Sequence, residues 1–186
     1  METQTEQEYR QVIRYCRDLF EKKTRDYGTA WRVLRLSSIT DQIYIKARRI
    51  RSIQEKGQQR VEDAVALEFV GIINYCLIAL MQQELPADAE PELGFDQLAV
   101  LYDRHVERNL ELLRNKNHDY GEAWREMRVS SITDIILMKL HRTRQIEDNA
   151  GQTLVSEGVE ANYRDMINYA VFALIKSDFL KTHVVD

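Results

Sequence analysis

Asp26-Tyr27-Gly28-Thr29-Ala30-Trp31-Arg32 returns 93 residues later as Asp119-Tyr120-Gly121-Glu122-Ala123-Trp124-Arg125, so the chain contains one unit twice. Between residues 23–53 and 116–146 the two copies are identical at 18 of 31 positions. About two identities are expected between unrelated segments of that length and average composition. The duplication therefore decides how the rest of the chain is organised.

The prolines, which interrupt helices, are confined to one stretch of the chain. Both prolines, Pro86 and Pro91, lie in an acidic stretch that we interpret as a linker over residues 84–97. Elsewhere apolar residues recur at spacings of three and four, which predicts helices throughout. The sequence thus predicts an all-α protein with a first helical repeat over residues 1–83 and a second over residues 98–186.

Each repeat is expected to hold three helices. The first ends at Asp-Tyr-Gly, where glycine accepts the positive φ of a helix stop. The second begins at Ser38 or Ser131, each a hydroxyl N-cap with an acid three residues later. The third runs over residues 59–83, and its twin ends at Leu174. Three helices cannot cover their own apolar faces, so we predict a shared core in a pseudo-two-fold six-helix bundle, like a homodimer joined into one chain.

Composition and charge indicate which classes of protein the chain can belong to. A net charge of −4 with 30% charged residues describes a soluble surface and does not favour a nucleic-acid binder, although residues 32–60 hold eight Lys or Arg and two acids. The polar N-terminus and the absence of a long apolar run predict a cytoplasmic protein without a membrane partner. Cys16 and Cys76 lack metal-site spacing and are expected to be core side chains.

Basic and aromatic side chains repeat in both copies. Lys46 and Arg49 are three residues apart, as are Lys139 and Arg142, so each pair projects from one helical face. Such a pair can hold a di- or triphosphate, although a solvated face with ion pairs would have the same pattern. The repeated aromatic residues are either base-stacking platforms or core anchors; they are Tyr27, Trp31, Tyr120 and Trp124.

Carboxylates and amides lie on the third helices. Asp63 and Glu68 in the first copy, and Glu157 and Asp165 in the second, are oxygen ligands of the kind that suits Mg²⁺. Asn74 and Asn168 interrupt strongly apolar runs. A buried amide requires a hydrogen-bond partner, so we expect them to pair across the pseudo-two-fold axis or to point into a polar pocket.

The order of these motifs resembles a known family. A lysine, Asp-Tyr-Gly, a Lys/Arg-rich helix and a helix ending in Asn-Tyr together resemble nucleotide modification associated domain 1 along nearly all of each copy. The pattern is more distantly similar to MazG-like all-α pyrophosphohydrolases, which cleave nucleoside triphosphates with Mg²⁺ held by Glu-x-x-Glu and Glu-x-x-Asp. The second motif falls on Glu68-x-x-Gly71 and Asn162-x-x-Asp165, so each copy keeps one half. The first falls where the chain offers only Asp41 or Asp134 and then basic residues.

The resemblance implies a nucleotide-binding protein. In its catalytic form this would be a Mg²⁺-dependent nucleoside triphosphate pyrophosphohydrolase, with Mg²⁺ on the four carboxylates and the lysine–arginine pairs neutralising charge. The sequence leaves open whether the protein is an enzyme at all. The alternative is a non-catalytic helical scaffold, or an interaction module that binds a protein or nucleic-acid partner. Pairing of two chains into a homodimer is also left open.

Overall fold

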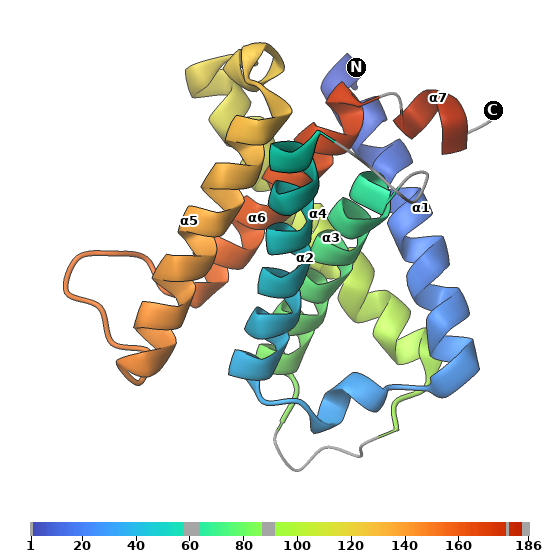
Figure 1. Ribbon diagram of the computed structural model, residues 1–186. Coiled ribbons are helices and arrows are strands. Elements are labelled where there is room, and N and C mark those ends of the chain that lie inside the picture. Colours follow the sequence, from blue (N-terminus) through green and yellow to red (C-terminus); the bar gives the residue numbers. More distant parts are fainter. Residues whose placement is uncertain (1, 58–63, 87–91, 178, 184–186) are drawn as a thin grey trace.

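The computed structural model describes residues 2–57, 64–86, 92–177 and 179–183, except for the side chains of Ala64 and Tyr120, and contains no strand in these ranges. The elements follow in the order α1 (Gln4–Tyr27), the 3₁₀ helix η1 (Ala30–Val33), α2 (Leu36–Lys56), α3 (Ala64–Glu84), α4 (Phe95–Tyr120), the 3₁₀ helix η2 (Ala123–Glu126), α5 (Val129–Asp148), α6 (Val159–Lys176) and the short α7 (Phe179–His183). The series α1, η1, α2, α3 is thus repeated by α4, η2, α5, α6 (Figure 1). The prediction of an all-α fold built on a duplicated three-helix repeat is confirmed.

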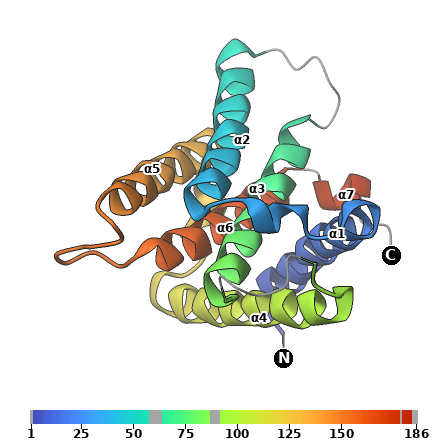
Figure 2. The ribbon, with the colours of Figure 1, turned by 90° about the horizontal axis from the view of Figure 1, so that it is seen from below.

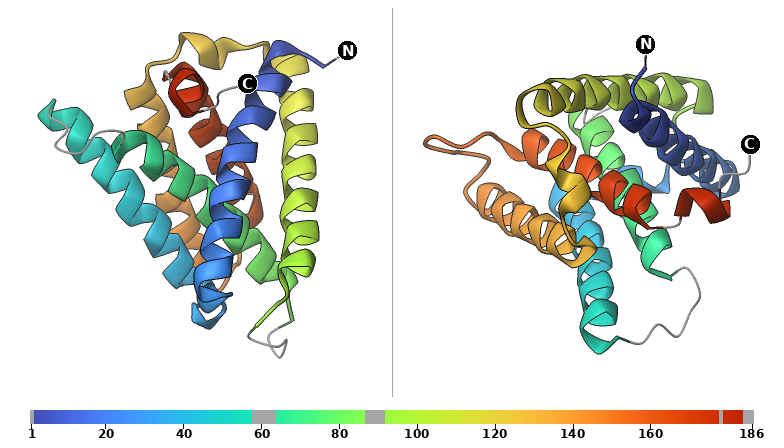
Figure 3. Two further views of the ribbon diagram at one scale, coloured as in Figure 1. Left: turned by 90° about the vertical axis from the view of Figure 1, so that its right-hand side faces the viewer. Right: turned by 90° about the horizontal axis from the view of Figure 1, so that it is seen from above.

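The six long helices form three layers of two. Helices α3 and α6 pack against each other in the middle, with α2 and α5 on one side and α1 and α4 on the other (Figures 2 and 3). Both α1 and α4 contact both central helices. Each layer therefore takes one helix from each repeat, and η1 and η2 lie at opposite ends of the bundle (Figure 1).

The layer of α2 and α5 is held by reciprocal ion pairs. Arg144 of α5 donates to Asp41 of α2 at 2.5 Å, and Arg51 of α2 lies 3.7 Å from Asp134 of α5. These are equivalent positions in the two repeats, exchanged between partners. The repeated acids at the helix starts therefore contact the other repeat, a contact that the sequence interpretation did not anticipate.

The layer of α1 and α4 is antiparallel and ionic on its outer side. Its ion pairs are Arg10–Glu107, Arg17–Asp103 and Arg114–Glu6, with N–O distances of 2.6–2.7 Å. All of these groups are partly exposed, so each pair contributes little stability by itself. The pairs mainly fix how the two first helices align.

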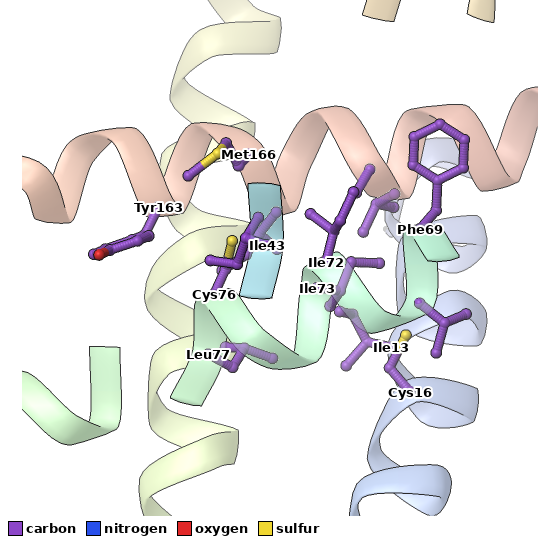
Figure 4. Close-up of a cluster of buried hydrophobic side chains, with 14 of the residues drawn as sticks. Ile13, Cys16, Ile43, Phe69, Ile72, Ile73, Cys76, Leu77, Tyr163 and Met166 are labelled. Carbon is purple, nitrogen blue, oxygen red and sulfur yellow. The ribbon is translucent and has the colours of Figure 1, made fainter. Parts of the chain in front are cut away.

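The central layer is apolar on nearly every side. Figure 4 shows Ile72, Ile73 and Cys76 of α3 beside Met166 of α6, with Ile13 of α1 nearby. By length and composition alone, the segment Val65–Glu84 of α3 could cross a membrane. However, 67% of its most apolar stretch is buried inside the bundle. Its composition is explained by its place between α6 and the outer layers.

Of the two alternatives predicted for the amides of the central helices, pairing with each other is wrong, whereas each amide does line a cavity of its own repeat. Asn74 donates to the backbone oxygen of Cys16 at 3.0 Å and accepts from the Tyr102 hydroxyl at 2.8 Å. Asn168 accepts from the side chain of Asn109 at 2.6 Å. The physical reason is that α3 and α6 meet through apolar side chains, which leaves both amides facing the α1 and α4 layer.

The starts of the second helices also differ from the prediction. Helix α2 begins at Leu36 with Arg35 as N-cap, α5 begins at Val129 with Arg128 as N-cap, and neither cap residue makes a side-chain capping bond. Ser38 and Ser131 therefore lie inside the first turn. The 3₁₀ helix leads into each α-helix through only two residues, so the chain reaches helical geometry before the expected serine.

Two predicted site residues, Asp63 and Glu157, fall near the starts of the third helices. Residues 58–63, and with them Asp63, lie outside the described residues. Glu157 was placed on the third helix of the second repeat, but α6 begins at Val159 and Glu157 is exposed in the loop before it. By contrast, Gly28 and Gly121 end the first helices with φ of 62° and 64°, as predicted.

Candidate functional site

Each repeat contains one cavity beside its Asp-Tyr-Gly turn. The first cavity, of about 610 Å³, lies among α1, η1, α2 and α3; the second, of about 410 Å³, lies among α4, η2 and α6. Every residue that lines the second cavity has its equivalent in the wall of the first. The identical pairs are Lys23/Lys116, Gly28/Gly121, Ala30/Ala123, Trp31/Trp124, Asn74/Asn168 and Tyr75/Tyr169.

The 3₁₀ helices are fixed against the third helices by matched contacts. Gln82 of α3 donates to the backbone oxygens of Arg32 and Leu34, at 3.2 and 3.1 Å. Lys176, at the same position of α6, donates to the backbone oxygen of Arg125. One contact is thus kept with different side chains, which holds the tryptophan of each turn in place.

The first cavity has two lysines and one carboxylate in its wall. Glu68 accepts from Arg49 at 2.6 Å and from Lys46 at 3.3 Å, so the stronger bond goes to the arginine. Lys46 also lies 5.7 Å from the centre of the Tyr75 ring. Lys23 is exposed and makes no hydrogen bond or ion pair with any described residue. The structure thus brings the predicted residues Lys46, Arg49 and Glu68 together.

In the second cavity, the lysine of the wall, Lys116, is paired with a carboxylate. Asp165 accepts from Lys116 and from Lys139, each at 2.6 Å, and its carboxylate is nearly buried. Burial acts to raise the pKa of Asp165, but the two lysine hydrogen bonds outweigh it and leave the pKa below its ordinary value. Arg142, the equivalent of Arg49, is half-buried and contacts no described acid. The structure thus brings the predicted residues Lys139 and Asp165 together, without Arg142.

The carboxylates of the two sites lie at different places on the third helix. Glu68 is equivalent to Asn162, and Gly71 is equivalent to Asp165, so the acid has moved by three residues, about one helical turn. A Cβ atom on Gly71 would lie 2.7 Å from Lys46 Cε and 3.0 Å from its Nζ. In the first repeat the lysine side chain thus covers the backbone at the position from which Asp165 projects in the second.

The aromatic side chains differ in their access to the cavities. Trp31 and Trp124 are 9% and 6% exposed, and neither indole N–H has a hydrogen-bond partner among the described residues. The Trp124 ring stacks on Phe172 with centres 4.2 Å apart and lies 4.4 Å from the Arg125 guanidinium. These contacts leave little free ring face, so Trp124 acts as a core anchor.

The predicted aromatic residues also include the tyrosine of each Asp-Tyr-Gly turn, Tyr27 and Tyr120. Tyr27 lines the first cavity and is 56% exposed, so its ring is accessible to a ligand. The side chain of Tyr120 lies outside the described residues. Among the predicted aromatic residues, Tyr27 is the one best placed for contact with a bound base.

Among the described residues, the predicted carboxylates do not fit a magnesium site; Asp63 lies outside those residues. Within the described ranges no three His, Cys, Asp or Glu side chains come together in a way that could hold a metal ion. Glu68 and Asp165 each accept from two cationic side chains, so their charge is already compensated. They also belong to different cavities, and the exposed Glu157 lies in a loop. A Mg²⁺ ion would have to displace these lysines and would still lack ligands.

The sequence interpretation missed several wall residues. Lys23, Lys116, Tyr75 and Tyr169 line the cavities but were not proposed as site residues. The signal was available, because all four are retained at equivalent positions in both copies. Retention alone, however, could not separate them from Arg51 or Asp134, which are retained and contact the other repeat instead.

Comparison with known proteins gives one match. The family described as nucleotide modification associated domain 1 matches residues 23–83 and, separately, residues 116–176. The two segments of 61 residues each make up about two thirds of the chain and contain almost every residue of both cavity walls. No curated protein and no solved structure matches the chain.

Proposed function

We propose that this chain, which belongs to the nucleotide modification associated domain 1 family through both repeats, binds a phosphorylated nucleotide in its first cavity. The observation that carries the proposal is the pair Lys23 and Lys46 in one cavity wall. Among the described residues only Lys46, of these two lysines, has a carboxylate partner, and that contact is long at 3.3 Å. The wall therefore carries one positive charge in excess, from two lysines and one glutamate.

The rest of the cavity suits a base and a sugar. Tyr15, Tyr27 and Tyr75 line it together with Trp31, and the volume of about 610 Å³ lies within the range of small-molecule sites. Aromatic faces stack on any base, while lysines bind phosphate oxygens as point charges. The phosphates would lie against Lys23 and Lys46, and the base against the exposed ring of Tyr27.

The proposal concerns binding and assigns no catalytic residue. The carboxylates of the described cavities are compensated by cations, so they support neither a metal-activated water nor an unpaired general base. Hydrolysis is therefore a separate question, which a second assay on the same samples answers. A cytoplasmic location, where nucleotides are abundant, is part of the proposal.

Isothermal titration with a panel of ribo- and deoxyribonucleoside mono-, di- and triphosphates, with and without Mg²⁺, tests it. We expect binding by the intact chain and a loss of about tenfold or more in affinity for Lys46→Ala, since a charge-assisted bond contributes about 1.5–3 kcal/mol. Lys22→Ala is the matched control, because Lys22 is exposed on α1 and pairs with Asp18 away from the wall.

Two results decide between a nucleotide-binding protein and a helical scaffold, and show whether a bound triphosphate is cleaved. If no nucleotide gives heat of binding, the proposal is overturned and the chain is a helical scaffold, whose repeated polar residues serve contacts such as Arg144–Asp41. A phosphate-release assay coupled to pyrophosphatase, run on the same samples, reports whether a bound triphosphate is cleaved.

A further inference from the structure

We infer that the first cavity contains one anion subsite, over Gly71 between Lys23 and Lys46, and that the second cavity fills its equivalent subsite with the carboxylate of Asp165. The inference deepens the proposed function and rests on it for the identity of the natural ligand. It predicts one ligand per chain, although both repeats have a cavity beside the Asp-Tyr-Gly turn. The occupied arrangement is present in the second cavity.

In the second repeat a carboxylate lies between two lysines. One oxygen of Asp165 accepts from Lys116 on α4, and the other accepts from Lys139 on α5, both at 2.6 Å. These short distances are typical of charge-assisted bonds. The two oxygens of one anion thus join three helices, and the lysine in the cavity wall already has a carboxylate in the place that a ligand would take.

In the first repeat the same two lysines are present without that anion. Gly71 replaces the aspartate, and the carboxylate in the cavity wall, Glu68, lies one turn earlier on α3. Glu68 takes its 2.6 Å bond from Arg49, which leaves Lys46 with the 3.3 Å contact. Lys23, the equivalent of Lys116, contacts no described acid. An anion that joined Lys23 and Lys46 would therefore complete the arrangement seen in the second repeat.

The missing side chain also provides the room. Lys46 passes directly over Gly71, with its Cε 2.7 Å from the position of a Cβ atom. A flexible lysine can withdraw from a glycine and leave an open place on the helix surface. A phosphoryl group has two or more oxygens on one centre, as a carboxylate does, so it can accept from both lysines at once. The ligand chemistry is a phosphate ester or an inorganic phosphate.

The test exchanges the two residues. Gly71→Asp gives the first repeat the carboxylate of the second, and Asp165→Gly does the reverse. Gly71→Asp is expected to fold normally, because Gly71 has helical backbone and the close atoms belong to the far end of the Lys46 side chain. Circular dichroism and thermal unfolding of each variant establish that it is folded before any titration.

Two probes are titrated into the full-length chain at matched ionic strength, inorganic pyrophosphate and the nucleotide that the intact protein binds best. We expect one site in the intact protein, at least tenfold weaker binding of both probes by Gly71→Asp, and a second site in Asp165→Gly. Lys23→Ala should weaken binding as Gly71→Asp does, whereas Lys22→Ala should not. If Asp165→Gly does not fold, the pair Gly71→Asp and Lys23→Ala still decides the question.

The outcomes separate the two proposals. Unchanged affinity in Gly71→Asp, or two equal sites in the intact protein, overturns the subsite while nucleotide binding stands. Binding of pyrophosphate that Gly71→Asp abolishes, without binding of any nucleotide, supports the subsite and overturns the proposed function. Absence of binding by either probe overturns both.

Discussion

The hydroxyl of Tyr102, in the second repeat, donates a 2.8 Å hydrogen bond to Asn74 in the first repeat. The equivalent residue Tyr9 reaches the other way and accepts from Asn109 of the second repeat at 3.2 Å. Both tyrosines are completely buried, and burial raises the pKa of each hydroxyl, so both stay protonated at physiological pH. Each first helix therefore completes the polar core of the other repeat.

Replacement of Tyr102 by Phe should destabilise the protein by about 1–3 kcal/mol, because the buried oxygen of Asn74 loses a donor. Urea unfolding followed by circular dichroism measures the change in midpoint. Tyr9→Phe is the matched control and should cost less, because its bond is longer. Equal costs for the two variants would show that the cross-repeat bond to Asn74 has no special weight.

Glu147→Gln should increase stability at pH 7. Burial raises the pKa of Glu147, against the hydrogen bonds from Thr40 and Tyr163. A raised folded-state pKa means that the folded protein loses stability as pH rises above 4.5, the ordinary value. The gain should vanish at pH 4 and stay below about 1 kcal/mol at pH 7, because the side chain is partly exposed.

The first repeat already contains a glutamine at the position equivalent to Glu147. Its equivalent in the first repeat is Gln54, whose amide already donates to Thr133 at 3.0 Å. Thermal unfolding from pH 4 to pH 8 should therefore show a smaller pH dependence in Glu147→Gln. A variant that parallels the parent protein at every pH would contradict the assignment.

Asp165→Asn should destabilise the protein by about 2 kcal/mol at pH 7. The change leaves Lys116 and Lys139 without a counter-charge, although Lys116 is 46% exposed and water compensates part of the loss. The pKa of Asp165 is lowered in the fold, so its contribution is complete above 3.8 and is lost as pH falls through the folded-state pKa. Unfolding free energies of parent and variant should therefore converge in strong acid.

Removal of divalent metal should leave stability and ligand binding unchanged. The described carboxylates are compensated by lysine and arginine, and no group of three ligating side chains forms among them. Titration in EDTA and in MgCl₂ of matched ionic strength compares the affinities. A gain of tenfold or more with Mg²⁺ for a diphosphate, absent for a monophosphate, would point instead to metal carried in by the ligand.

Cys16 and Cys76 should be inert in the folded protein. Both thiols are completely buried, and burial raises their pKa, so the reactive thiolate is scarce. A thiol-reactive chromophore should label neither in native buffer and both in denaturant. Rapid labelling under native conditions would show that the central layer opens far more often than its packing suggests.

The fold followed from the sequence wherever the two copies could be compared. The helical spacing and the Asp-Tyr-Gly stops are local signals, and two copies doubled their weight. Tertiary contacts were harder, because a repeated polar residue has the same appearance whether it lines a cavity, as Lys23 does, or pairs with the other repeat, as Asp41 does. The N-caps failed because a 3₁₀ helix started the α-helix two residues early.

The candidate site was predictable only in outline. The spacing predicted that Lys46 and Arg49 project from one face of the second helix, but that both contact Glu68 of the third helix is known only from the structure. The exchange of Gly71 for Asp165 was visible as a broken motif, but its effect on the lysines depends on which side chain reaches which oxygen. That geometry arises from the packing of three helices and cannot be deduced from spacing along one of them.

Asp165 cannot be diluted away from the lysines that it contacts. A group on the same chain has an effective concentration set by the fold, commonly millimolar or more even for flexible tethers. A solute at micromolar concentration competes poorly against such a tethered carboxylate. Under the proposed subsite, the anion of the second cavity is supplied by the chain itself, whereas the anion of the first cavity would come from solution and would depend on its concentration there. The difference arises from a shift of the acid by three residues along the third helix.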